Sequence, residues 1–469
     1  MKLHLNRETL NNEFKVKNDL DQKVRLTHTS GPKGKKLLPY TASDNVINKY
    51  QALLGNFSRE VSLKKYEEFD KESFFKSIEK NVESKESDKF LTIINELFFD
   101  EQGELVMSHP FFFNYLEEGG NNEKKVALFL KEVLASSEII DKVSKLYNER
   151  PNNVLLSLLY ASLPALEEKT KREESKEYVC ILPEIKELFK EDLLFLLEDN
   201  ELLISHFKDL ILYYYLFYTT QLILDLDRMF AEKKEKVYPV YFNVSWETRS
   251  KTRDSFKQGW KMVSAKLSKL FAHINCLAML NHMENDEYPT VTYDHFKELV
   301  SSLSGEQQEE IAVDIKQLNK DYQSYLGDVD WAKIKRIYSF EEQDDALKSV
   351  EELFHSISFQ FQKKISSRSR AAERYYEGYL EFVKRYFLKQ SGSLGYTFNL
   401  SQDQVIFLTK LCIKGKKKMP LRELFIQMEE RGVFFDRDSR RHVTELFERL
   451  NILEKKSDSG DAQYVKYIL

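Results

Sequence analysis

Three arginines near the C-terminal end are the residues whose type and spacing best suit the binding of a ligand. Arg437, Arg440 and Arg441 fall on one side of a predicted helix, together with Thr444. The other side of that helix is apolar, and its residues are Val443, Leu446, Phe447 and Leu450. On a helix that enters a major groove, arginine bonds to a guanine edge or to a phosphate. The pattern therefore predicts DNA contact by this helix, with docking to a protein as the alternative.

The elements that must position these arginines are two more helices and two short β-rich runs. Ser401 and Gln404 form a capping box at the start of a first helix. A second amphipathic helix starts at Leu421 and stops at Gly432, and Asp436 can cap the third. The runs ILEKK and QYVKYIL follow, joined by the turn sequence SDSGDA. Three helices and a hairpin in this order predict a winged helix-turn-helix module over residues 398–469.

Lysines add to the positive charge of this module. They lie in the loop KGKKKMP before the second helix and at the start of the wing, and they are Lys416, Lys417, Lys418, Lys455 and Lys456. Residues 400–469 hold 14 Lys/Arg and 11 Asp/Glu, a net of +3 in a chain of net charge -5. Asp458 and Asp461 at the wing tip would repel a phosphate backbone, so protein docking stays open.

A second basic constellation lies in the middle of the chain. Arg249, Arg253, Lys257 and Lys261 recur every four residues beside an apolar helix seam. Between 249 and 269 there are seven basic residues and one acid, Asp254, a local net of +6. Such a stripe suits the regularly spaced charge of a phosphate backbone. An acidic protein partner and a plain solvated face are the alternatives.

Recognisable catalytic and metal-binding patterns are missing from the sequence. His273, Cys276 and His282 fit no standard zinc spacing, and His273 is expected to be a core histidine. No HExxH or GxSxG motif and no phosphate-cradling glycine loop is present. The sequence therefore predicts no catalytic residue, no metal and no cofactor. A metal-dependent nuclease with an unrecognised site is the alternative.

Composition indicates a mainly α-helical chain. Glycine 15 and proline 9 give 24 punctuating residues in 469, roughly 5% against a usual ~12%, too few for many short strands. Three distant cysteines indicate a reducing compartment, so a cytoplasmic location is expected. The longest uncharged stretch, 210–224, is shorter than the ~20 residues that span a bilayer, which predicts a buried helix and no membrane partner.

The chain is expected to divide into four parts. These are an irregular or β-like segment over 1–45, a helical region over 46–166, a central long-helix domain over 178–390, and the winged module over 398–469. Long helices are predicted over 183–197, 201–232, 253–283, 291–301, 305–326 and 340–389. The run 237–246 contains Pro239 and reads as an edge strand or a connector. The run SGSLGYTFN (391–399) reads as a linker.

The C-terminal stretch, especially LNILEKKSDSGDAQYVK, resembles the end of the DptG family of bacterial DNA phosphorothioation-dependent restriction proteins. LLPYTASDNVINKY near the N-terminus, the helical content and the length are similar as well. The resemblance implies a cytoplasmic defence protein that acts with two companion proteins, at least one of them ATP-driven, against DNA lacking backbone sulfur. It supplies no catalytic residues. We therefore expect a non-catalytic subunit that binds double-stranded DNA and docks an ATPase partner, or a pure docking scaffold.

Overall fold

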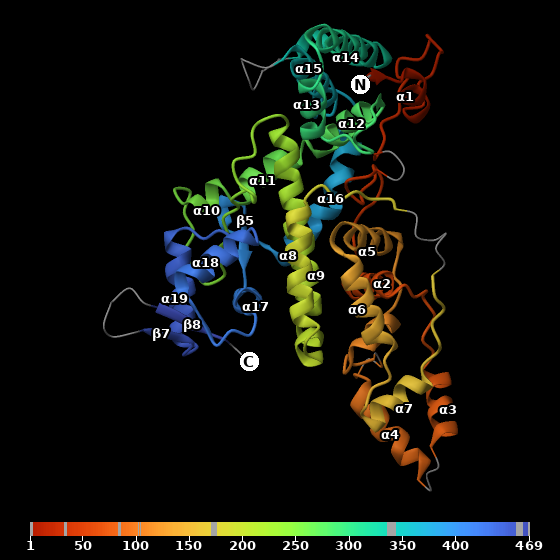
Figure 1. The fold of residues 1–469 in the computed structure, drawn as a ribbon, viewed down its shortest axis with the longest axis vertical. Coiled ribbons are helices and arrows are strands. Elements are labelled where there is room, and N and C mark those ends of the chain that lie inside the picture. The colour runs from red at the N-terminus through yellow and green to blue at the C-terminus, as the bar shows by residue number, and fades with distance from the viewer. Residues whose placement is uncertain are drawn as a thin grey trace. The chain divides into compact units, whose positions relative to one another are not determined.

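The protein is mainly helical, as its composition predicts. The computed structural model describes residues 3–31, 35–82, 86–101, 103, 105–169, 176–334, 344–455 and 463–467. Helix accounts for 59% of the residues, and the described residues form 19 α-helices with a few short strands (Figure 1). No helix among these residues has the length and apolar character needed to cross a bilayer.

The chain folds into two compact units, each assembled from stretches far apart in sequence. Unit 1 comprises 1–46, 219–400 and 432–442, and unit 2 comprises 47–218, 401–431 and 443–469. The division into four consecutive ranges that the sequence suggests stays a prediction. Two helices, α9 (Asn200–Arg228) and α19 (Arg437–Arg449), begin in one unit and continue in the other.

Unit 1 is a helical body with two small sheets. Its elements in chain order are β1 (His4–Leu5), α1 (Arg7–Glu13), β2 (Asn243–Val244), α10 (Asp254–Lys257), α11 (Trp260–Leu267), α12 (Leu270–Leu280), β3 (Met283–Glu284), α13 (Tyr293–Ser301), α14 (Gly305–Tyr325), η3 (Trp331–Lys333), α15 (Asp345–Gln360), α16 (Ser369–Tyr386), β4 (Leu388–Gln390), η4 (Gly392–Leu394) and β5 (Tyr396–Leu400). Helices α14 and α15 lie side by side, and α12 packs against both α15 and α16 (Figure 1). The rings of Phe271 and Tyr375 stack 4.7 Å apart between α12 and α16.

The run 391–399, which the sequence suggests is a linker, contains η4 and most of β5 and forms part of a β-hairpin. Strand β5 pairs with β4 on one side, antiparallel, and with β2 on the other, parallel. Phe398 and Leu400 of β5 are 0% exposed, so these two side chains lie in the core. The predicted edge strand is confirmed as β2, at the edge of this three-stranded sheet.

Two long helices expected from periodicity are interrupted. The run 253–283 contains α10, α11 and α12, whose seam residues from Trp260 to Ile274 are nevertheless buried. The first break occurs at Gly259, where the preceding Gln258 carbonyl accepts a hydrogen bond from the Tyr241 amide at 3.2 Å. Within the described part of 340–389, α15 and α16 are separated at 361–368, where Lys364 has a φ of 72°. Tertiary hydrogen bonds and a left-handed residue thus override the periodic pattern.

Unit 2 combines the N-terminal helices with most of the C-terminal elements. In chain order these are α2 (Tyr50–Ser62), α3 (Lys71–Asn81), α4 (Ser87–Phe98), η1 (Pro110–Tyr115), α5 (Asn121–Leu134), α6 (Ser137–Asn148), α7 (Val154–Ser162), α8 (Pro183–Leu196), α17 (Gln402–Ile413), β6 (Lys418–Pro420), α18 (Leu421–Glu430), β7 (Leu453–Lys455) and β8 (Gln463–Lys466). Helix α2 packs against α5, and α3 lies beside α7 (Figure 1). The first part of α9, including the apolar stretch from Leu210 to Tyr218, is buried in this unit.

The C-terminal elements occur in the order that the sequence predicts, with one addition. Ser401 accepts a hydrogen bond from the Gln404 amide at the start of α17, so the capping box is confirmed. The lysine-rich stretch before α18 is not entirely loop, because Lys418–Pro420 forms strand β6. The three strands pair antiparallel in the order β6-β8-β7. The turn 456–462, with Lys456, Asp458 and Asp461, lies outside the described residues.

Candidate nucleic-acid interface

Helix α19 has one exposed basic side and one buried side. Arg437, Arg440 and Arg441 are exposed, and Thr444 is half-buried. The buried side consists of Ser439, Val443, Leu446 and Phe447, each at most 1% exposed. Leu450 was predicted to belong to that side, but it is 37% exposed because the helix ends at Arg449. The arginines of the first turns therefore point away from the core.

The first turn of α19 is fixed to unit 1 by backbone and side-chain hydrogen bonds. The Asp436 carboxylate accepts from the Ser439 amide at 3.0 Å, which caps the helix as the sequence predicts. The segment before it pairs with residues 240–242, where the Phe242 amide donates to the Phe434 carbonyl at 2.9 Å. The Ser439 hydroxyl is also within 3.2 Å of the Phe242 carbonyl. These hydrogen bonds hold the first turn of α19 within unit 1.

Arg253 lies inside this anchor, in a group that we call the cap junction: Glu247, Arg253, Asp436 and Ser439. Its Nε donates to Asp436 Oδ2 at 2.9 Å, and its Nη2 donates to Glu247 Oε2 at 3.2 Å and to Ser439 Oγ at 2.8 Å. The Arg253 and Asp436 side chains are each 9% exposed, and that of Glu247 is 0% exposed. The structure therefore places Arg253 in a buried ion network and not on the outward stripe that its spacing suggests.

The cap junction perturbs the acidity of its members. Burial by itself would raise the pKa of Asp436, but hydrogen bonds from Arg253 and the Ser439 amide, with the arginine charge, lower it to about 2. Burial raises the pKa of Glu247 above its usual value, an effect that Arg253 only partly offsets. The pKa of Arg253 is raised because its two carboxylate partners outweigh its burial. Asp436 and Arg253 are consequently a charged pair at neutral pH.

The other members of the central basic segment divide into inward and outward groups. Arg249 is partly buried and donates to the Asn399 side chain at 2.6 Å, and burial lowers its pKa. Lys257 and Lys261 are exposed, and the Lys261 ammonium lies 5.3 Å from the centre of the Phe256 ring. The structure thus brings this segment to the first turn of α19 through Arg253, and it leaves the two lysines at the surface.

The C-terminal lysines of unit 2 are exposed, and two of them have carboxylate partners. Lys418 pairs with Glu454 at 2.7 Å, and Lys455 pairs with Glu448 at 2.5 Å. Lys416 and Lys417 lie at the surface between α17 and β6. Exposed ion pairs of this kind are weak, so a phosphate can compete for these lysines.

Two of the three residues considered for metal binding, His273 and Cys276, lie in the core of unit 1. His273 is 1% exposed, its Nδ1 lies 3.1 Å from the Tyr293 hydroxyl, and burial lowers its pKa to about 3. Burial also raises the pKa of the Cys276 thiol to about 12, so the thiol stays protonated. Within the described ranges, no group of three or more His, Cys, Asp or Glu side chains is arranged to hold a metal ion.

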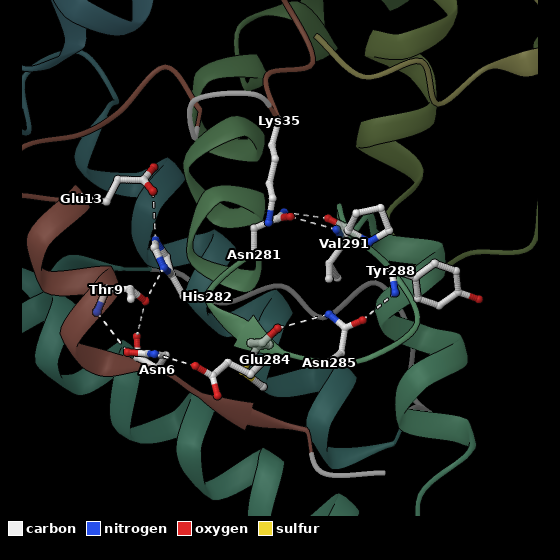
Figure 2. A pocket seen from close by; sticks show the side chains of 12 residues that line it. Asn6, Thr9, Glu13, Lys35, Asn281, His282, Glu284, Asn285, Tyr288 and Val291 are labelled. Carbon is white, nitrogen blue, oxygen red and sulfur yellow. Dashed lines mark hydrogen bonds and ion pairs between the residues drawn. The ribbon is translucent and has the colours of Figure 1, made fainter. Parts of the chain in front are cut away.

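A polar cavity of about 390 Å³ lies in unit 1 where α1 meets the end of α12. Figure 2 shows the His282 ring between Thr9 and Glu13, and its Nδ1 and Nε2 lie 2.9 Å and 3.1 Å from their respective oxygens. Asn6 donates to Glu284 at 2.6 Å, and Asn281 exchanges two hydrogen bonds with the Val291 backbone. These side chains join α1 and β1 to the segment after α12, so their hydrogen bonds serve the fold.

Comparison with known proteins assigns no family. No family model matches the chain. No curated protein sequence matches it either. The function must therefore be argued from the residues and their geometry.

Proposed function

We propose that this protein is a non-catalytic DNA-binding and scaffolding subunit of a bacterial phosphorothioation-dependent restriction complex. It acts with ATPase partners against DNA that lacks the modification. The observation that carries the proposal is the row of exposed arginines on α19, whose first turn is locked to unit 1 by the cap junction. A cationic helix face held rigidly at its N-terminal end suits binding to a duplex.

In this proposal α17, β6, α18, α19, β7 and β8 form a winged helix-turn-helix, with α19 as the helix that enters the major groove. The strand order β6-β8-β7 and the alternation of helices and strands agree with that assignment. Arg437, Arg440 and Arg441 would bond to bases or phosphates, and Thr444 would follow one turn later.

The complex-level part of the proposal depends on the sequence resemblance to the DptG family. The ATPase partners and the cytoplasmic location are inferred from that resemblance. A scaffold that docks proteins without touching DNA is the second candidate, favoured by Glu454 and Glu448, which pair with Lys418 of β6 and Lys455 of β7.

Duplex binding by the full chain tests the DNA-binding role. We expect the affinity for a fluorescent 30-base-pair duplex to fall steeply with salt. Replacing Arg437, Arg440 and Arg441 with alanine should flatten the slope of log K against log salt by about 2.7, at about 0.9 for each lost phosphate contact. If the variant instead lost affinity only for duplexes with one particular base pair, and the salt slope did not change, the arginines would contact bases and not phosphates.

A matched control separates local from general charge effects. Lys234, Lys316 and Lys320 are three exposed cations of the same unit, remote in sequence from the proposed interface. Their replacement with alanine should leave the slope unchanged. Equal effects of the two triple variants, or no duplex binding by the wild-type chain, would refute the DNA-binding role. Nicking of plasmid by the pure protein with Mg²⁺ or Mn²⁺, abolished by one carboxylate substitution, would make it a nuclease.

A further inference from the structure

Arg253 belongs to the basic segment expected to contact DNA, yet its guanidinium is engaged inside the protein. It donates to Asp436, Glu247, Ser439 and the Thr248 carbonyl, the last at 2.8 Å. With 9% of its side chain exposed, it has little surface to offer a phosphate. The hydrogen bonds of its guanidinium are thus made largely to the cap and first turn of α19.

The partner of Arg253 occupies a position that matters for an approaching polyanion. Asp436 directly precedes Arg437 and lies one turn before Arg440, at the end of α19 where the positive helix dipole favours anions. An unneutralised carboxylate there would oppose a phosphate at the place where the arginines would attract it. Arg253 cancels that charge and, by the same hydrogen bonds, fixes the cap.

We propose that Arg253 is a positioning residue for DNA binding by α19: it neutralises the Asp436 cap and holds the first turn so that Arg437, Arg440 and Arg441 meet the duplex. This inference rests on the proposed function. It assigns Arg253 a role through Asp436 instead of a direct phosphate contact, and the two roles make different predictions.

The charge sum of the Asp436–Arg253 pair provides the test. The carboxylate and the guanidinium together carry no net charge. Arg253→Met changes this sum to -1, and the double variant Arg253→Met with Asp436→Asn returns it to zero. Asparagine caps helices as well as aspartate does, so the double variant keeps the cap.

Duplex binding is measured as a function of salt for wild type, Arg253→Met, Asp436→Asn and the double variant. We expect Arg253→Met to weaken binding about tenfold, from a like charge near the contact, with an unchanged salt slope. We expect the double variant to regain most of that loss. A slope reduced by about 0.9 in Arg253→Met, or no recovery in the double variant, would overturn the inference.

Folding and function are separated by two further measurements. Arg253→Lys keeps the positive charge, so it should bind DNA more tightly than Arg253→Met does. This difference between the two variants can be interpreted without assuming that either loses its fold. If the wild-type chain does not bind the duplex, the proposed function fails, and hydrogen exchange still tests the positioning role. The amides of 437–442 must then exchange faster in Arg253→Met than in wild type and recover in the double variant, or the inference fails as well.

Discussion

Removal of Arg431 should destabilise unit 2 more than any surface substitution in it. The Arg431 and Asp192 side chains are 1% and 0% exposed, and they join the end of α18 to α8. The guanidinium forks onto the carboxylate through Nε at 2.9 Å and Nη2 at 2.7 Å. Tyr214 donates to the same carboxylate at 2.7 Å, and Lys414 lies 3.3 Å from it. Asp192 is thus held in the core by three partners, of which Arg431 alone makes two hydrogen bonds to the carboxylate.

The expected cost follows from these contacts. Arg431→Met removes two charge-assisted hydrogen bonds, worth about 1.5 kcal/mol or more each, and leaves a buried carboxylate with Tyr214 and Lys414 only. Breaking a buried pair from one side costs about 3–5 kcal/mol. For a unit of this size that corresponds to a fall in Tm of roughly 10 °C.

Urea and thermal unfolding of the full chain, followed by hydrogen exchange of the α18 and α8 peptides, measure this loss. Arg422→Ala is the matched control, because Arg422 is an exposed arginine on the same helix and its loss should change stability by about 0.5 kcal/mol or less. Replacing both members, Arg431→Met with Asp192→Asn, should recover part of the loss, since no unpaired charge remains. Equal stability of Arg431→Met and Arg422→Ala would refute the reasoning.

Three further predictions concern unit 1 and helix α19. The stability difference between wild type and Asp436→Asn should be constant above about pH 4 and vanish as the pH falls toward 2, because the folded-state pKa of the aspartate is depressed to about 2; pH-dependent unfolding that shows no such change would contradict the pairing. Gly259→Ala should lower Tm, because a Cβ there would lie 2.2 Å from a backbone carbonyl, whereas Gly305→Ala, with open space around it, should be neutral or stabilising by calorimetry. Leu446→Ala should cost about 2–5 kcal/mol in urea unfolding and Leu450→Ala less than about 1, a contrast that would disappear if both residues were core.

Local features of the fold could be read from the sequence because they depend on neighbouring residues. The capping box at Ser401, the cap at Asp436 and the end of α18 before Gly432 are set by hydrogen bonds and backbone preferences within a few residues. The buried side of α19 follows from helical periodicity, which is why Val443, Leu446 and Phe447 were found and only the last position failed.

The sequence alone could not predict which residues far apart in the chain would pair. Arg253 has the same i, i+4 spacing as Lys257, and nothing local distinguishes the buried side chain from the exposed one. Its partner Asp436 is 183 residues away, and Glu247 gave no signal at all. The hairpin that replaced the expected linker likewise depends on β2, about 150 residues earlier.

The sequence by itself determined that the chain is helical, where α17 and α19 are capped, and which side of α19 is apolar. Only the tertiary structure decided which cations reach the surface, because burial and ion pairing depend on segments that meet after folding. Periodic apolar residues specify a helix face, but a charge becomes available or engaged only when its partner has been brought beside it.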